Sequence, residues 1–355
     1  MEEGKKIRRY IETYIPVSAC NMKCTYCYLD EDRNRKINKL KWSPEHIRKA
    51  LSKKRLGGAC LINLCAAGET MLLPDFDMLV FQLVQEGHYI SIVTNGTFEP
   101  AFEKMAQFSR EIWEHLFFKF SLHYFELQRL DKFEVFWKHV NLVKEKGGAF
   151  TIELTPDDKY IPIQDDIYNM CLEHVGAACH ISIPRDDTKP EKPIFSQNSL
   201  KQLSEIWSRF DSSLFKFKEE IWGVQRNEFC YAGDWSFLLD FNDGTIRACY
   251  ESKEIIQNIM DDVDKPINFC AVGTCCPSCH CYNGHAFLSL GVIPELDAPT
   301  YAVLRDRNEQ WLNNTIRDVF STKLNETNGE YSDFRKRNNN LMKYVNKVKK
   351  KIFRE

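Results

Sequence analysis

Three cysteines near the N-terminus have a spacing that suits a metal centre. Cys20, Cys24 and Cys27 form the pattern C-x₃-C-x₂-C. Structural zinc sites nearly always use four ligands, whereas this loop offers three and no nearby fourth. A [4Fe–4S] cluster held by three thiolates leaves one iron open to another ligand. The spacing therefore indicates an iron–sulfur cluster with an open iron, and a zinc knuckle is the alternative.

A second group of seven cysteines lies between residues 230 and 281. Cys230 and Cys249 bracket a predicted β-hairpin whose tight turn is at residues 242–244, so each strand end would present one thiol. Two such thiols and a distant pair could hold an iron–sulfur cluster, and a zinc site is the alternative. The thiols that could complete this site are Cys276, Cys279 and Cys281, while Cys270 and Cys275 leave room for a second one.

The composition indicates a reducing compartment. The chain has 355 residues and 14 cysteines, enough length to fold without disulfides, and its first residues are charged rather than apolar. Because its net charge is −2 and no apolar run reaches the length of a membrane helix, we expect a cytoplasmic protein without a membrane or nucleic-acid partner. A hydrophobic content of 43% excludes intrinsic disorder.

The first cysteine group follows the first of six apolar strands that alternate with helix-length segments. Such βα units predict an α/β fold, a partial (β/α)₆ barrel of parallel strands. Loops at the carboxyl ends of these strands would carry the chemistry. The expected strands are residues 13–19, 59–66, 89–95, 116–123, 149–155 and 178–184.

Within these strands, apolar and polar residues alternate. Phe118, Phe120 and Leu122, for example, oppose Lys119, Ser121 and His123. Alternation sends one set under the helices and the other into the barrel lumen, where polar groups need water, substrate or cofactor. An antiparallel sheet with one face in solvent is the alternative. The lumen set also includes Asn63, Ser91, Glu153, His180 and Ser182.

The first cysteine group and the strand ends beside it resemble the radical S-adenosylmethionine (SAM) superfamily. The motif C-x₃-C-x-aromatic-C stands as Cys20, Cys24, Tyr26 and Cys27, and the resemblance covers residues 12 to about 185. It implies a [4Fe–4S] cluster on the three cysteines, whose open iron binds SAM, with Tyr26 near the adenine. The family's Gly-Gly-Glu-Pro motif is looser here, because Thr70 replaces the proline. The resemblance implies SAM contacts from Gly68, Glu69, Thr94, Asn95 and Ser121.

The second cysteine group resembles the SPASM and Twitch extensions of radical SAM enzymes, whose pattern opens with C-x₉₋₁₅-G-x₄-C. Cys230, Gly244 and Cys249 fit that opening, but His285 stands where the full SPASM pattern continues with cysteine. The resemblance therefore implies one auxiliary [4Fe–4S] cluster, as in Twitch domains.

The chain divides into four expected parts. Residues 1–185 form the barrel, 186–228 a linker and helix, 229–300 the auxiliary-cluster domain and 301–355 a helical basic tail. We expect the apolar face of that tail, with Leu341, to dock on its own domain, because most such helices do. A basic amphipathic helix that binds a membrane or nucleic acid is the alternative.

The resemblance implies an enzyme that cleaves SAM reductively to a 5′-deoxyadenosyl radical, with electrons from a donor such as flavodoxin or ferredoxin. We expect hydrogen abstraction from a small polar substrate, such as a saccharide or natural product, because the lumen offers polar side chains. His123 and Glu153 are the predicted catalytic residues at the strand ends. A SPASM-type maturase of peptide or protein side chains is one alternative, and a non-catalytic iron–sulfur or zinc protein is another.

Overall fold

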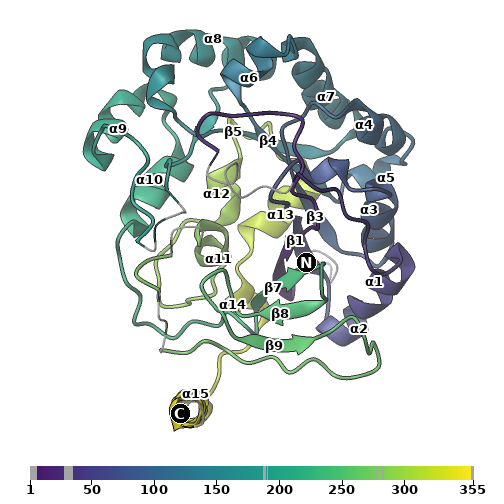
Figure 1. Ribbon diagram of the computed structural model, residues 1–355, viewed down its shortest axis with the longest axis vertical. Helices are drawn as coiled ribbons and strands as arrows, with labels where there is room; N and C mark the ends of the chain where they lie inside the picture. The colour runs from purple at the N-terminus through teal and green to yellow at the C-terminus, as the bar shows by residue number, and fades with distance from the viewer. Residues whose placement is uncertain are drawn as a thin grey trace.

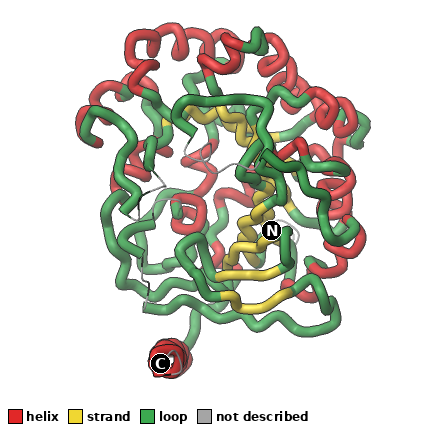
Figure 2. Tube along the Cα trace, viewed as in Figure 1, coloured by secondary structure: helices red, strands yellow, loops and turns green. Residues whose placement is uncertain are grey.

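The computed structural model describes residues 6–27, 35–186, 189, 191–274, 276, 278–281 and 284–352. Its centre is a nine-stranded sheet with the order β6-β5-β4-β3-β2-β1-β7-β8-β9, and strands β1 to β6 pair in parallel. The strands form a curved row enclosed by helices (Figure 2), which confirms the α/β partial barrel. The parallel strands are β1 (Arg9–Tyr14), β2 (Cys60–Leu64), β3 (Tyr89–Thr94), β4 (Leu116–Ser121), β5 (Ala149–Leu154) and β6 (His180–Ile181).

Helices follow the strands and line the outside of the sheet (Figure 1). Ser43 caps the first helix by accepting from the backbone N–H of His46, and Gly147 ends a later helix at φ +90°. These helices are α1 (Pro44–Ala50), α2 (Lys53–Leu56), α3 (Phe76–Gln85), α4 (Glu99–Met105), α5 (Arg110–Trp113), α6 (Tyr124–Arg129), α7 (Phe133–Lys146) and α8 (Gln164–Val175).

The first and last barrel strands differ from the expected ranges. β1 covers residues 9–14, because Pro16 has no N–H with which to continue the ladder. Beyond it, Ile15 and Val17 make isolated bridges to Ala66 and Ile37. The last strand, β6, has two residues instead of seven, since only β5 pairs with it.

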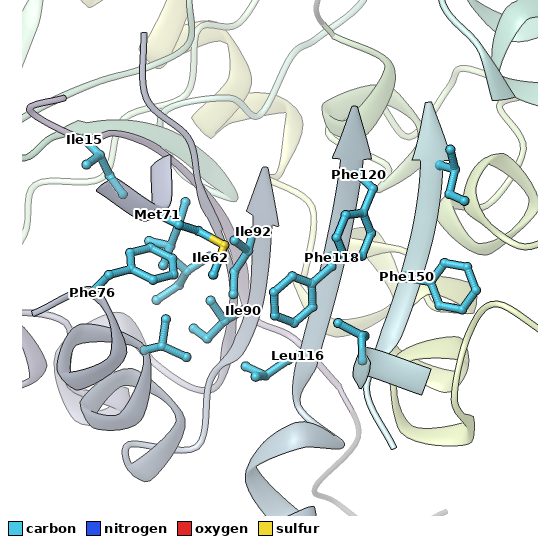
Figure 3. Close-up of a cluster of buried hydrophobic side chains, with 14 of the residues drawn as sticks. Ile15, Ile62, Met71, Phe76, Ile90, Ile92, Leu116, Phe118, Phe120 and Phe150 are labelled. Carbon is cyan, nitrogen blue, oxygen red and sulfur yellow. The ribbon is translucent and has the colours of Figure 1, made fainter. Parts of the chain in front are cut away.

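The alternation within the strands is confirmed by two separate cores. Phe118, Phe120 and Ile152 belong to the core beneath the outer helices, part of which Figure 3 shows around β3 and β4. Leu61 and Phe117, from the opposite face, pack with residues beyond 216. The lumen is therefore apolar at the amino ends of the strands and polar at their carboxyl ends, whereas we expected polar residues along it.

The C-terminal segments complete this inner core. Phe117 makes an edge-on contact with Phe320, whose ring also lies 4.6 Å from that of Tyr301. The helices of this part are α9 (Leu200–Ile206), α10 (Ser213–Ile221), α11 (His285–Ser289), α12 (Tyr301–Arg305), α13 (Asn314–Ser321), α14 (Leu324–Thr327) and α15 (Asp333–Ile352). The 3₁₀ turns are η2 (Thr70–Leu72), η3 (Asp158–Ile163) and η4 (Ser208–Phe210).

The expected hairpin is present and extends the barrel sheet. Strand β7 (Ser236–Asp240) pairs in parallel with β1, and β8 (Thr245–Arg247) returns antiparallel to β7. Gly244 makes the turn at φ +75°, and β9 (Ile255–Asn258) forms the far edge. The sheet thus runs without a break from the barrel into the region of the second cysteine group.

Helix α15 departs from the expected docking of its apolar face. Asn339 and Asn340 bond to Ala271 and Thr274, but Leu341 is 59% exposed. Figure 1 shows the helix projecting from the rest of the fold. The expectation that Leu341 docks on its own domain is therefore wrong, and the side chains of Val348 and Ile352 lie outside the described residues. No helix among the described residues is long and apolar enough to cross a membrane.

Candidate active site

The first cysteine group lines a cavity of about 330 Å³ at the carboxyl ends of the barrel strands. Cys20, Cys24 and Cys27 lie on the loop after β1, and all three are half-buried. Burial, followed by repulsion from Cys27 and Cys20, raises the pKa of Cys24 to about 12. The thiols are therefore close enough to interact, as the predicted cluster requires.

The chemistry of this donor set fits an iron–sulfur cluster. Among the described residues, no group of three or more Cys, His, Asp or Glu side chains is packed as closely as a single metal ion requires. Thiolates around a [4Fe–4S] cluster stand farther apart, because each binds a different iron. The three thiols on one loop suit that wider arrangement.

Gly68 holds the strand-end segment against the cluster loop. Its N–H donates to the carbonyl of Val17 at 3.0 Å, and the N–H of Glu69 donates to that of Ala19 at 2.9 Å. A Cβ atom at residue 68 would lie 1.9 Å from the carbonyl oxygen of Ala19. Only glycine permits this approach, so the residue predicted to contact SAM also shapes the loop.

The carboxylate of Glu69 is buried and already accepts three hydrogen bonds. The hydroxyl of Thr94 donates to it at 2.7 Å, the N–H of Asn95 at 2.7 Å and the N–H of Met71 at 3.1 Å. Burial raises the pKa of Glu69, and these bonds oppose the rise. Glu69 and Thr94, both predicted SAM contacts, line the cavity while joining the ends of β2 and β3.

Asn95 fixes the first cysteine of the cluster loop. Its side-chain amide donates to Asn21 at 2.7 Å and lies 3.8 Å from the Cys20 sulfur. Asn21 in turn donates to Thr97 at 2.8 Å. The sequence analysis missed Asn21, although its place directly after Cys20 could have drawn attention to it. Asn95 therefore has a positioning role beside its predicted contact with SAM.

Glu126 is a second positioning residue that the sequence analysis missed. Its carboxylate accepts from the backbone N–H of Lys23, at 2.7 Å, between the first two cysteines. Arg129 holds the same carboxylate with two hydrogen bonds, of 2.9 and 2.8 Å. Sequence spacing gives no signal for this contact, because α6 reaches the loop only in the folded chain.

Tyr26 and His123 form a pair at the cluster end of the cavity. The Tyr26 hydroxyl lies 2.6 Å from Nδ1 of His123, and the hydroxyl of Tyr160 donates to it at 3.3 Å. Burial lowers the pKa of His123 to about 4, so the imidazole is neutral at pH 7. His123 lines the cavity as predicted, and its partner is the aromatic residue predicted to face the adenine.

Glu153 lies on β5 and is paired with Arg305. Arg305 also bonds to Nε2 of His285 at 2.7 Å. Burial tends to raise the pKa of Glu153, but the charges of Arg305 and then Lys119 outweigh it. The net effect is a lowered pKa, so the carboxylate is charged. Glu153 and Ser121 both line the cavity, whereas His180 does not, because it packs against Ser212 and Trp311.

His285 explains one departure from the SPASM pattern. It begins α11 and lines the barrel cavity rather than the second cysteine group. Burial, followed by the charge of Arg305, lowers the pKa of His285 well below its ordinary value. The neutral ring accepts from Arg305. The residue at the family's cysteine position thus belongs to the barrel site.

The second cysteine group surrounds a smaller cavity of about 60 Å³. Burial, followed by repulsion from three other thiols, raises the pKa of Cys230. Apolar side chains such as Phe287 and Leu288 share the rest of the lining with polar residues, among them Glu251 and His280. The four thiols that line this cavity are Cys230, Cys249, Cys276 and Cys281.

The remaining cysteines of this region lie elsewhere. Cys279 is exposed and does not line the smaller cavity. Its sulfur lies 3.5 Å from Nδ1 of His280. Cys270 contacts Asn339 of α15, and Cys275 lies outside the described residues. Of the two candidates for a fourth ligand, the placement favours Cys281 over Cys279.

Comparisons with known proteins agree with this geometry. The sequence profile described as the radical SAM superfamily matches residues 14–149. Among solved structures, native anSMEcpe with bound AdoMet and Kp18Cys peptide is 19% identical, covering 73% of this chain and 80% of its own, at a TM-score of 0.51. SuiB of Streptococcus suis is 14% identical, covering 88% and 77%, at a TM-score of 0.52.

SuiB bound to S-adenosylmethionine is 15% identical, with 90% and 77% covered and a TM-score of 0.51. At these identities the likeness concerns the fold. No curated protein sequence matches the chain. The superfamily profile runs from the end of β1 to the start of β5, and the cluster loop with its supporting strand ends lies within it. The chain therefore carries a radical SAM domain at residues 14–149 and is an enzyme whose cofactors are a [4Fe–4S] cluster and SAM.

Proposed function

We propose that the barrel cavity is the site where this enzyme takes a hydrogen atom from a small polar substrate, such as a saccharide or natural product. When bound, the cluster and SAM supply a 5′-deoxyadenosyl radical. Cys20, Cys24 and Cys27 would hold the cluster at one end of the cavity. The chain's own contribution is to bind, to orient and to exclude water.

One observation carries this proposal: the cluster thiols and a set of polar side chains line the same cavity. Lys119 and Glu153 reach it from neighbouring strands, and Lys218 and Arg305 from the C-terminal helices α10 and α12. A substrate in this cavity would lie beside the cofactor. A protein that only carries electrons has no use for such a chamber.

The roles proposed for the remaining site residues follow their places in the cavity. Tyr26, Gly68, Glu69, Thr94, Asn95 and Ser121 would contact SAM. His123 would act from the end of β4, where it holds Tyr26, and Glu153 from the neighbouring strand β5, where it holds Arg305. Both are proposed to orient the substrate.

We further propose that residues 229–300 hold one auxiliary [4Fe–4S] cluster. Cys230, Cys249, Cys276 and Cys281 would be its ligands, with Cys279 outside. An electron donor such as flavodoxin or ferredoxin would supply the reducing electron.

A peptide substrate is the second candidate. It is favoured by the fold similarity to anSMEcpe, which was solved with a bound Kp18Cys peptide. Phe195, which lines the cavity and is 51% exposed, marks where a longer substrate could leave it. Pools of peptides and of sugars, each added to the reconstituted enzyme with SAM, would separate the two classes. The pool that increases the formation of 5′-deoxyadenosine contains the substrate class.

The test uses the full chain, reconstituted anaerobically with iron and sulfide. With dithionite and SAM, the wild type should form 5′-deoxyadenosine. A triple Cys20→Ala, Cys24→Ala, Cys27→Ala variant should lose about four irons and all cleavage. Cys171→Ala, which removes a buried thiol on the outer helix α8, is the control and should retain both. Reductive cleavage by the triple variant would refute the proposal.

A further inference from the structure

Two lysines bring positive charge to the cavity from different elements. Lys119 lies on β4, and Lys218 lies on α10 with only 3% of its surface exposed. The ammonium of Lys218 donates to the hydroxyl of Ser182 at 2.7 Å. Within the described part of the chain, neither lysine has a carboxylate within ion-pair distance. Among the described residues, neither ammonium group therefore forms an ion pair.

The carboxylates that line the same cavity are engaged elsewhere. Glu153 is paired with Arg305, and Glu69 accepts its three hydrogen bonds at the strand ends. Glu12 accepts from Tyr10 and, at 2.6 Å, from Asn63. Burial raises the pKa of Glu12, and the charge of Lys119 opposes the rise. Within the described chain, no cavity carboxylate thus forms an ion pair with either lysine.

The pKa of Lys218 agrees with the lack of a paired carboxylate. Burial and then the charge of Arg185 lower the pKa of Lys218 to about 7, against the opposing effect of Glu153. A buried ammonium keeps its charge when an anion lies beside it. Among the described residues, the charged carboxylate of Glu153 is paired with Arg305 instead, so no anion lies within ion-pair distance of Lys218.

We infer that the substrate carries an anionic group, a carboxylate or a phosphate, which Lys119 and Lys218 bind. This inference rests on the proposed function, because it concerns the same cavity. Lysine suits such a role, since its ammonium is a compact point charge with three donors. Arg305 lies beside them, fully buried, and its Nε has no hydrogen-bond partner among the described residues.

The experiment titrates inorganic phosphate and acetate into the reconstituted, SAM-bound enzyme by calorimetry, at constant ionic strength set with sodium chloride. We expect saturable binding of at least one anion to the wild type. Lys218→Met and Lys119→Met should each weaken that binding at least 10-fold. The matched control is Lys216→Met on the same helix, whose side chain is 64% exposed and paired with Asp211, and it should bind as the wild type does.

Stronger binding of phosphate would assign a phosphorylated substrate, and stronger binding of acetate a carboxylate. The inference is overturned if neither anion saturates the wild type, or if both lysine variants bind as tightly as it does. It is also overturned if both variants lose SAM affinity by the same factor, because the lysines would then serve the cofactor's carboxylate.

The same samples are assayed for 5′-deoxyadenosine, which separates this inference from the proposed function. Cleavage of SAM without anion binding overturns the inference alone. Anion binding without cleavage overturns the proposed function.

Discussion

At residue 68, the absence of a side chain allows the cluster loop to form. A Cβ atom there would stand 1.9 Å from the carbonyl oxygen of Ala19, a contact that the backbone can relieve only by moving the loop. We expect Gly68→Ala to contain about four fewer iron atoms per chain than the wild type, because the SAM cluster would be lost. Iron analysis after reconstitution measures this. Gly329→Ala is the control, because no atom lies within 4 Å of its Cβ position. A Gly68→Ala variant with full iron content would contradict the close packing.

The carboxylate of Glu69 is the second test at this scale. The Glu69 carboxylate accepts hydrogen bonds from two N–H groups and one O–H group. In Glu69→Gln, the amide NH₂ is itself a donor, so it would face at least one of these donors and lose that hydrogen bond. We expect the free energy of unfolding to fall by about 1–3 kcal/mol, measured by denaturant titration.

If Glu69 also accepts from the SAM ammonium, the same variant should weaken SAM binding by roughly 10- to 150-fold. Loss of stability with unchanged SAM affinity would restrict Glu69 to a structural role.

At the scale of elements, the hairpin and the segment after it bring four thiols around one small cavity. We expect Cys281→Ala to lose the spectroscopic signal of the auxiliary cluster, as Cys230→Ala and Cys249→Ala should. Cys279→Ala is the matched control, since its thiol is exposed and does not line that cavity. Electron paramagnetic resonance of the reduced proteins reads out the signal. The opposite result, loss in Cys279→Ala alone, would place the fourth ligand at residue 279.

His88 ties β2 to α1 and makes this contact sensitive to acid. Its Nε2 bonds to the carbonyl of Leu51 at 2.7 Å, and its Nδ1 accepts from the N–H of Cys60 at 3.1 Å. The ring is therefore neutral, and burial lowers the pKa of His88 from 6.5 to about 4. Because the unfolded chain binds the proton more readily, the stabilisation is present above pH 6.5 and is lost as the pH falls toward 4.

Over that interval the wild type should lose about 3 kcal/mol more than His88→Gln, which offers a donor and an acceptor without titrating. Urea unfolding at a series of pH values measures the difference. Parallel pH curves for the two proteins would show that the pKa of His88 is the same in the folded and unfolded states.

At the scale of the whole molecule, the described side chains at the end of helix α15 do not contribute to the core or to the site. Asn340 makes the last hydrogen bond from this helix to the rest of the described chain, and Leu341, Met342 and Tyr344 are exposed. We expect deletion of residues 341–355 to change the free energy of unfolding by less than about 0.5 kcal/mol, with iron content unchanged. Thermal and denaturant melts check the stability. A large loss would reveal contacts of the tail beyond the described residues.

The sequence by itself determined the chemistry and the chain's local architecture. Three thiols within eight residues, followed by glycine and carboxylate at the next strand end, predicted the radical SAM site, because ligand spacing and strand-end position are local properties. The alternation of Phe118 and Phe120 with Lys119 likewise identified the two faces of β4, since a strand has period two. The same reasoning extended β1 past Pro16, where the missing N–H ends the ladder.

Only the tertiary structure decided what depends on contacts between distant segments. It paired Tyr26 with His123 and Glu153 with Arg305, turned His285 into the barrel, and separated Cys279 from the other thiols of its group. It also closed the amino end of the lumen with Phe320 and left Lys119 and Lys218 facing the cavity with no carboxylate of the described residues within ion-pair distance. Hydrophobic packing and charge pairing act between groups that meet only after folding, so their partners cannot be identified from spacing along the chain.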